Sequence, residues 1–160
     1  MFGGRKSSAD SPRRSGASLH ERVRAGLAQG FRGSLSDVSL GPSEADLLVH
    51  QGPRVAVFEV KTGDPDLPLP SSTSAQMLLL KQQTRLRFPG EDVQEVLPVL
   101  VTNYRVSPED QKELEDQGIT VVRIDPTSSS SSKSATFSRQ VASLTGLQTD
   151  PVDLQSAEQS

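Results

Sequence analysis

The sequence predicts one mixed α/β domain over residues 18–126, with a mixed central sheet and helices packed on its faces. Two observations lead to this fold class. The first half of the region holds three short extended stretches joined by turns that contain Gly and Pro, a pattern typical of hairpins. The second half alternates strands with helices, as parallel βαβ units do. The predicted order of elements is therefore α-β-β-β-α-β-α-β.

The first element is predicted to be a helix over residues 19–31. Ser18 followed by Glu21 matches a capping box at its start, and Gly30 and Gly33 bracket its exit. The apolar residues that recur at helical spacing are Leu19, Val23 and Leu27.

Three strands follow, and they are predicted at residues 35–40, 45–50 and 54–61. Gly41-Pro42 separates the first strand from the second. The tripeptide Gln51-Gly52-Pro53 turns the second strand into the third, which indicates a hairpin.

The second half of the domain starts with a helix over residues 75–87, which Pro89-Gly90 stops. A buried strand is predicted at 93–102, although Pro98 is unusual inside a strand. Ser107 then matches an N-cap, with Pro108 at the first helical position and acidic residues after it. Gly118 closes this helix, and the last strand is predicted at residues 119–124.

The segments on either side of this domain are polar. Residues 1–17 are predicted to be a disordered basic leader, and 127–160 a Ser-rich linker with a largely disordered tail and a short helix at 135–147. Residues 1–32 hold seven Lys/Arg against two Asp/Glu, and the rest of the chain holds ten against eighteen, which reproduces the net charge of −3. The basic end is either an arm that touches phosphates or a solvated leader, and the sequence leaves both readings open.

Composition excludes several classes of function. The chain has no cysteine, which rules out disulfides and thiolate metal sites and fits a reducing, cytoplasmic location. No apolar run approaches the roughly 20 residues that cross a bilayer, so no membrane partner is expected. The first residues lack the apolar stretch of a secretory signal.

The strand RVAVFEVK, residues 54–61, carries the most distinctive charges of the chain. Side chains alternate along a strand, so Glu59 and Lys61 share one face with Val55 and Val57. Both faces are apolar as far as Phe58, which indicates a central strand. A carboxylate next to such surroundings needs a partner, because an unpaired charge there is costly.

The hairpin supplies a second carboxylate. If the turn centres on Gln51-Gly52, Asp46 faces Val57 and lies diagonal to Glu59, while Glu44 lies nearly opposite Glu59. Two carboxylates that converge repel each other unless a cation neutralises them. Oxygen ligands without His or Cys favour a hard ion, Mg²⁺ or Mn²⁺, and we assign no role to His20 or His50. Lys61 points into the same place and would orient an attacking water or stabilise the charge that grows on a phosphate.

The stretch EADLLVHQGPRVAVFEVKTG, with Asp46 before a hairpin and Glu59-Val60-Lys61 after it, resembles the PD-(D/E)XK, or restriction-endonuclease-like, nuclease superfamily. The resemblance covers most of residues 18–125, since the α-β-β-β-α-β order matches the core of that family. It implies a metal-dependent nuclease that hydrolyses phosphodiester bonds in DNA. One departure is Ala45, because the family motif has Pro just before the Asp.

The resemblance also implies roles for individual residues. Asp46, Glu59 and the Val60 carbonyl would hold Mg²⁺ or Mn²⁺, and Lys61 would assist the attacking water. Glu21 of the first helix matches a further acidic ligand that many members have, and Gln76 matches a Gln that some members carry in the next helix. We also expect the basic helix that holds Lys81 and Arg85 to contact phosphates.

Two alternatives to an active nuclease remain at this stage. One is a nuclease-like domain that no longer cuts and serves as a module that binds nucleic acid or protein. The other is an ordinary α/β domain of unrelated function, which would follow if Asp46 and Glu59 were far apart. DNA is the expected partner, and a homodimer or a larger complex is also considered, by analogy with other small nucleases.

Overall fold

The computed structural model describes residues 19–149, apart from residues 32, 91 and 125–131. The predicted order of elements is confirmed, and one further helix follows it. The predicted leader at 1–17, Ser18 of the capping box, residues 127–131 of the linker and the tail from residue 150 lie outside the described residues. The elements are a helix over residues 19–30, then β1 (Leu35–Ser39), β2 (Glu44–Gln51), β3 (Arg54–Lys61), α2 (Thr73–Arg87), β4 (Glu95–Thr102), α3 (Pro108–Asp116), β5 (Thr120–Arg123) and α4 (Ser132–Thr145).

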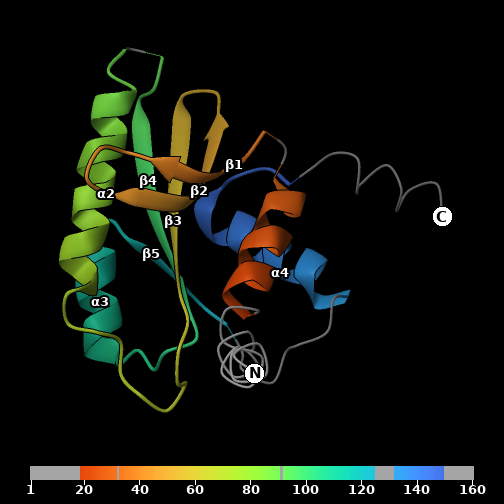
Figure 1. Ribbon diagram of the computed structural model, residues 1–160, viewed down its shortest axis with the longest axis vertical. Coiled ribbons are helices and arrows are strands. Elements are labelled where there is room, and N and C mark those ends of the chain that lie inside the picture. Colours follow the sequence, from red (N-terminus) through yellow and green to blue (C-terminus); the bar gives the residue numbers. More distant parts are fainter. Residues whose placement is uncertain (1–18, 32, 91, 125–131, 150–160) are drawn as a thin grey trace, which may run out of the picture.

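The five strands form one mixed sheet in the order β1-β2-β3-β4-β5 (Figure 1). β2 pairs antiparallel with both β1 and β3, whereas β3, β4 and β5 run parallel to one another. This division confirms the predicted fold class, a mixed α/β sheet flanked by helices. β3 lies at the centre of the sheet, as its apolar sequence indicated.

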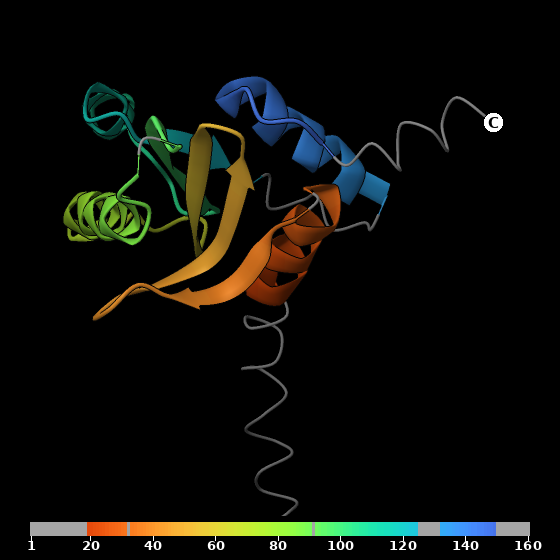
Figure 2. The same ribbon diagram turned by 90° about the horizontal axis from the view of Figure 1, so that it is seen from above.

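Helices cover both faces of the sheet. The helix of residues 19–30 and α4 lie on one face, and α2 and α3 lie on the other (Figures 1 and 2). Each pair of helices closes its own apolar core, and Phe58 of β3 packs with Phe31 in the first of them. No helix in the described part of the chain combines the length and apolarity needed to cross a membrane.

The β2–β3 hairpin turns later than the sequence suggested. The turn centres on Gly52-Pro53, because Gln51 pairs with Arg54 and Leu47 with Phe58. Gly52 has a φ of 59°, and a proline after it completes the pattern of a two-residue type II′ turn. The predicted register, with Asp46 opposite Val57, is therefore wrong by two residues.

Pro98 lies inside β4 and is buried, and its position explains why the strand tolerates it. Residues of β4 alternate between its two neighbours, and Thr102 faces β5, since its carbonyl accepts from the Ile124 N–H. Pro98 therefore also faces β5, but the ladder with β5 begins one residue later, at Val99. Its missing N–H removes no hydrogen bond from the sheet.

The predicted short helix at 135–147 is present as α4, shifted by a few residues, and it packs into the core. Val141 and Leu147 are buried in the same cluster as Phe58. Arg54 donates to the carbonyls of Gly146, at 3.0 Å, and Thr145 at the end of α4. The compact unit therefore extends beyond residue 126.

Candidate active site

Asp46 lies in β2 at a position that is left out of the pairing with both neighbouring strands. Its ladder with β3 ends at Leu47–Phe58, and the pairs with β1 stop on either side of Asp46. The residue level with it on β1, Asp37, has a φ of 53°, which is unusual for a residue other than glycine. This local distortion also breaks the alternation of side chains, because Ala45 packs in the same core as Leu48. The result is a loosened strand end from which the Asp46 side chain reaches its neighbours.

The Asp46 carboxylate takes the place of a backbone acceptor. The Val60 N–H donates to Asp46 Oδ2 at 2.7 Å, although no backbone ladder continues there between β2 and β3. This bond holds the carboxylate beside the residue that precedes Val60, which is Glu59. One step beyond the Leu47–Phe58 pair, Asp46 is level with Glu59 and not diagonal to it.

The carboxyl groups of Asp46 and Glu59 are neighbours at this strand end, because the Val60 N–H holds Asp46 beside Glu59. Burial raises the pKa of the Glu59 carboxyl from 4.5 to about 8, and the hydrogen bond and negative charge of Asp46 add to this rise. The charge of Glu44 raises the pKa further, whereas Lys61 lowers it. The pKa of Glu59 is raised because a negative charge on this carboxyl is costly away from solvent and beside Asp46. Glu44 itself is exposed, and it pairs with Ser39 of β1 and not with Glu59.

Lys61 ends β3 two residues after Glu59, on the same side of the strand, and it is half-buried. Its backbone is anchored by the next loop. Its carbonyl accepts from the Asn103 N–H at 3.4 Å, and the buried Asn103 side chain makes two bonds of 2.8 Å with the backbone of Gly63. Tyr104 lies so close to Gly63 that a Cβ there would be 2.1 Å from its hydroxyl oxygen. These contacts of Asn103 and Tyr104 with Gly63, here called the Gly63 clamp, fix the direction in which the chain leaves Lys61.

We expect Asn103→Ala to lower the free energy of unfolding by about 2 kcal/mol, because the buried Asn103 side chain and its two hydrogen bonds to the Gly63 backbone are lost. Chemical denaturation measures the change. The control is Gln82→Ala, which removes an exposed amide side chain. It should change the free energy of unfolding by less than about 0.5 kcal/mol. Equal stability of the Asn103 variant and the wild type would show that the Gly63 clamp contributes nothing.

His20 is a site residue that the sequence did not reveal. Its Nε2 lies 3.3 Å from Asp46 Oδ1, and its side chain is 32% exposed. Leu27 of the same helix faces the core, so the adjacent helix surface that carries His20 and Arg24 faces β1 and β2, where Arg24 pairs with Asp37. Glu21, the acidic residue expected here, is exposed. The i, i+4 spacing of His20 and Arg24 is the signal that could have indicated this surface.

The structure does not bring the expected substrate-binding residues of α2 together with the carboxylates. Arg85 donates to the Val93 carbonyl, just before β4 begins, whereas Lys61 is level with Thr102 at the other end of that strand. Lys81 lies beside Gly118 at the start of β5. Gln76 is exposed in the first turn of α2, which follows the loop after Lys61. Of these three residues, Gln76 alone lies at the end of the sheet where β3 finishes.

The donor set of this site suits a hard divalent cation. Asp46 and Glu59 supply carboxylate oxygens, and a cation beside them would offset the cost of a negative charge on Glu59. The residues described hold no group of three or more His, Asp or Glu side chains already arranged around one point. The carboxylate pair is therefore the core of any metal site here, and further ligands would come from the backbone, from solvent or from a small shift of His20.

Comparisons with known proteins give only distant likenesses. No family model matches the sequence, and no curated protein matches it. A crystal structure of a repair endonuclease from Pyrococcus abyssi is 16% identical, with a TM-score of 0.46, and the match covers 69% of this chain and 45% of that one. Protein VC1899 from Vibrio cholerae is 14% identical, with a TM-score of 0.48, and the match covers 78% of this chain and 31% of that one.

A third structure, of a protein of unknown function called AF1548, is 18% identical with a TM-score of 0.43. This match covers 62% of this chain and 56% of the other. The present chain thus spans between a third and a little over half of each of these proteins. Because every TM-score is below 0.5, the evidence for function comes from the site itself.

Proposed function

We propose that this chain is a metal-dependent nuclease that hydrolyses phosphodiester bonds in DNA. The observation that carries the proposal is that Asp46 is level with Glu59 and held beside it by the Val60 N–H, with Lys61 two residues beyond Glu59. Two neighbouring carboxyl groups at a strand end, with one ammonium group two residues away, are suited to binding a cation and stabilising an anionic substrate.

Each residue has a defined task in this proposal. Asp46, Glu59 and the Val60 carbonyl would hold Mg²⁺ or Mn²⁺, and the cation would supply a water of lowered pKa and Lewis-acid polarisation of the phosphate. The bond from the Val60 N–H keeps Asp46 turned toward Glu59. Lys61 places its positive charge where negative charge develops on the phosphate.

His20 is the residue of the first helix that we add to the site. Its contact with Asp46 Oδ1 orients the carboxylate from the side opposite to Val60. Glu21 remains a proposed ligand only if the helix rotates, because it is exposed in the structure. Gln76 keeps its proposed substrate contact, whereas the positions of Lys81 and Arg85 make them poorer candidates.

The proposal is tested by incubating the protein with single-stranded, duplex and branched DNA in the presence of Mg²⁺ or Mn²⁺. We expect cleavage by the wild type and loss of at least about 99% of it in Glu59→Ala, since the cation loses a ligand. The matched control is Glu44→Ala, which removes an exposed carboxylate from the same neighbourhood and should retain most of the activity.

Metal binding measured by calorimetry on the same proteins separates the alternatives. Cation binding that depends on Glu59, without cleavage of any substrate, would support the module that binds but no longer cuts. Neither binding nor cleavage by the folded wild type would overturn the metal site altogether.

A further inference from the structure

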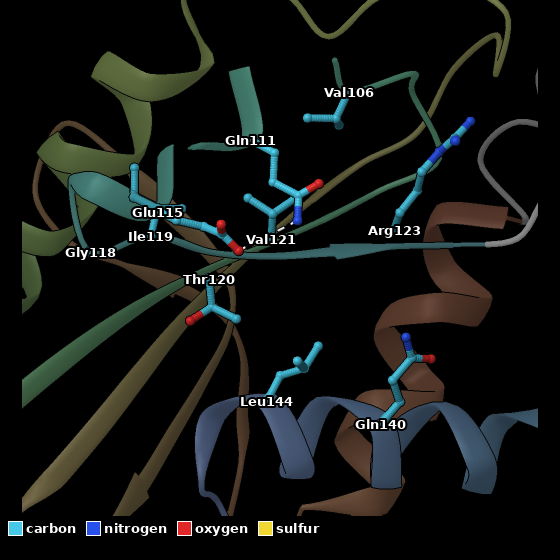
Figure 3. Close-up of a pocket in the computed structure, with 10 residues that line it drawn as sticks. All are labelled: Val106, Gln111, Glu115, Gly118, Ile119, Thr120, Val121, Arg123, Gln140 and Leu144. Atoms are coloured by element: carbon cyan, nitrogen blue, oxygen red, sulfur yellow. Dashed lines mark hydrogen bonds between the residues drawn. The ribbon is translucent and has the colours of Figure 1, made fainter. Parts of the chain in front are cut away.

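β5 is the last strand of the sheet, and no strand in the described part of the chain pairs with its outer edge. Figure 2 shows the strand between α3 on one side and α4 on the other. A pocket of about 620 Å³ lies along it, and residues from both helices line it (Figure 3). This pocket is separate from the carboxylate site, since it contains neither Asp46 nor Glu59.

The backbone of β5 presents unused hydrogen-bonding groups to this pocket. The Ile124 N–H donates to Thr102 of β4, and alternate residues of a strand point the same way. Thr120 and Val122 therefore face β4, while the N–H and C=O groups of Val121 and Arg123 face the open edge. Open edges of this kind accept another strand.

The side chains along this edge carry opposite charges at its two ends, so two antiparallel copies of the edge are complementary in charge. Figure 3 shows the Glu115 carboxylate over the Thr120–Val121 end of the strand, with Arg123 extending from the other end. Among the described residues, Arg123 has no carboxylate partner, and Glu115 has only a 3.4 Å contact with Gln111. Leu144 of α4, which is 54% exposed, adds an apolar surface on the other side of the strand.

We propose that this edge is a dimer interface, where β5 pairs antiparallel with β5 of a second copy of the chain. A two-fold axis through Val122 places Val121 opposite the partner's Arg123, so each pair exchanges two backbone hydrogen bonds. Opposed residues lie on the same face of a sheet, so the partner's Arg123 comes to the α3 side, next to Glu115. The symmetric pairing therefore forms two ion pairs, each between Glu115 of one copy and Arg123 of the other. This inference is independent of the proposed nuclease activity.

The interface is tested by sedimentation and light scattering of the full chain from micromolar to millimolar concentrations. We expect reversible dimers of the wild type, and dissociation constants raised at least about tenfold in Arg123→Glu and in Glu115→Arg, because each variant sets like charges against each other. The double variant Arg123→Glu/Glu115→Arg restores the opposite charges and should return the constant to within about threefold of the wild type.

The matched control is Arg87→Glu at the end of α2, which lies near Ser39 of β1 at the opposite edge of the sheet and should leave association unchanged. Circular dichroism establishes that each variant is folded. A wild type that stays monomeric at all concentrations would overturn the proposal. So would a dimer that both single variants leave intact, or one that the double variant fails to restore.

Discussion

Lys61→Ala is expected to lower the turnover number for DNA cleavage by at least about a hundredfold, while the affinity for Mn²⁺ changes by less than about threefold. The reason is that Lys61 is not among the proposed ligands but lies two residues beyond one of them, on the same side of β3. Removing its charge takes away stabilisation of the anionic transition state and leaves both carboxylates in place. Single-turnover kinetics and calorimetry measure the two quantities separately.

Two further variants sharpen this test. Lys112→Ala removes an exposed lysine of α3 and should leave turnover unchanged. Lys61→Arg keeps a positive charge but changes its shape, so partial activity is expected. Turnover of Lys61→Ala equal to that of the wild type would remove Lys61 from the mechanism, and a parallel loss of metal affinity would make it a structural residue.

Glu59→Gln is expected to stabilise the metal-free protein at alkaline pH and to have little effect on stability near pH 4. The pKa of Glu59 lies at about 8 in the folded protein, above its ordinary value of 4.5, so the folded state holds a proton that the unfolded state has released. The free energy of unfolding of the wild type therefore falls as pH rises between these two values. Glutamine carries no charge at any pH, so the variant escapes this loss.

The size of the effect is limited by solvent. The full rise in pKa would correspond to about 5 kcal/mol, but the side chain is partly exposed and screening reduces this to about 1–2 kcal/mol. Denaturation in urea at pH 4.5 and pH 9, in the presence of a chelator, measures the difference between variant and wild type. Glu44→Gln serves as the control. A difference that is the same at both pH values would show that Glu59 ionises freely in the folded state.

The elements of this fold were accessible from the sequence because local chemistry marks their ends. Ser107 and Pro108 were expected to start a helix, and the Ser107 side chain accepts from the Asp110 N–H as an N-cap does. The apolar run from Val55 to Phe58 indicated a central strand, and β3 lies at the centre of the sheet. Such signals depend on neighbours along the chain, so one sequence is enough to detect them.

The contacts of α4 were less accessible. A short helix was predicted at 135–147, but no local pattern indicated that Val141 would join the core beneath the first helix. Its close approach depends on Gly30, where a Cβ would lie 2.2 Å from Ser138 Oγ. Two segments that are more than a hundred residues apart must fit together there, and no local pattern encodes that fit.

The sequence by itself determined which residues carry the candidate chemistry, since a Glu and a Lys in an apolar strand and an Asp before a hairpin stand out by residue type alone. Only the tertiary structure decided how they meet. The turn at Gly52-Pro53 made Asp46 level with Glu59, and the packing of the first helix brought His20, not Glu21, to Asp46. Register and helix rotation follow from the fit of many side chains across the core, and a change of one or two residues in either moves a different side chain into the site.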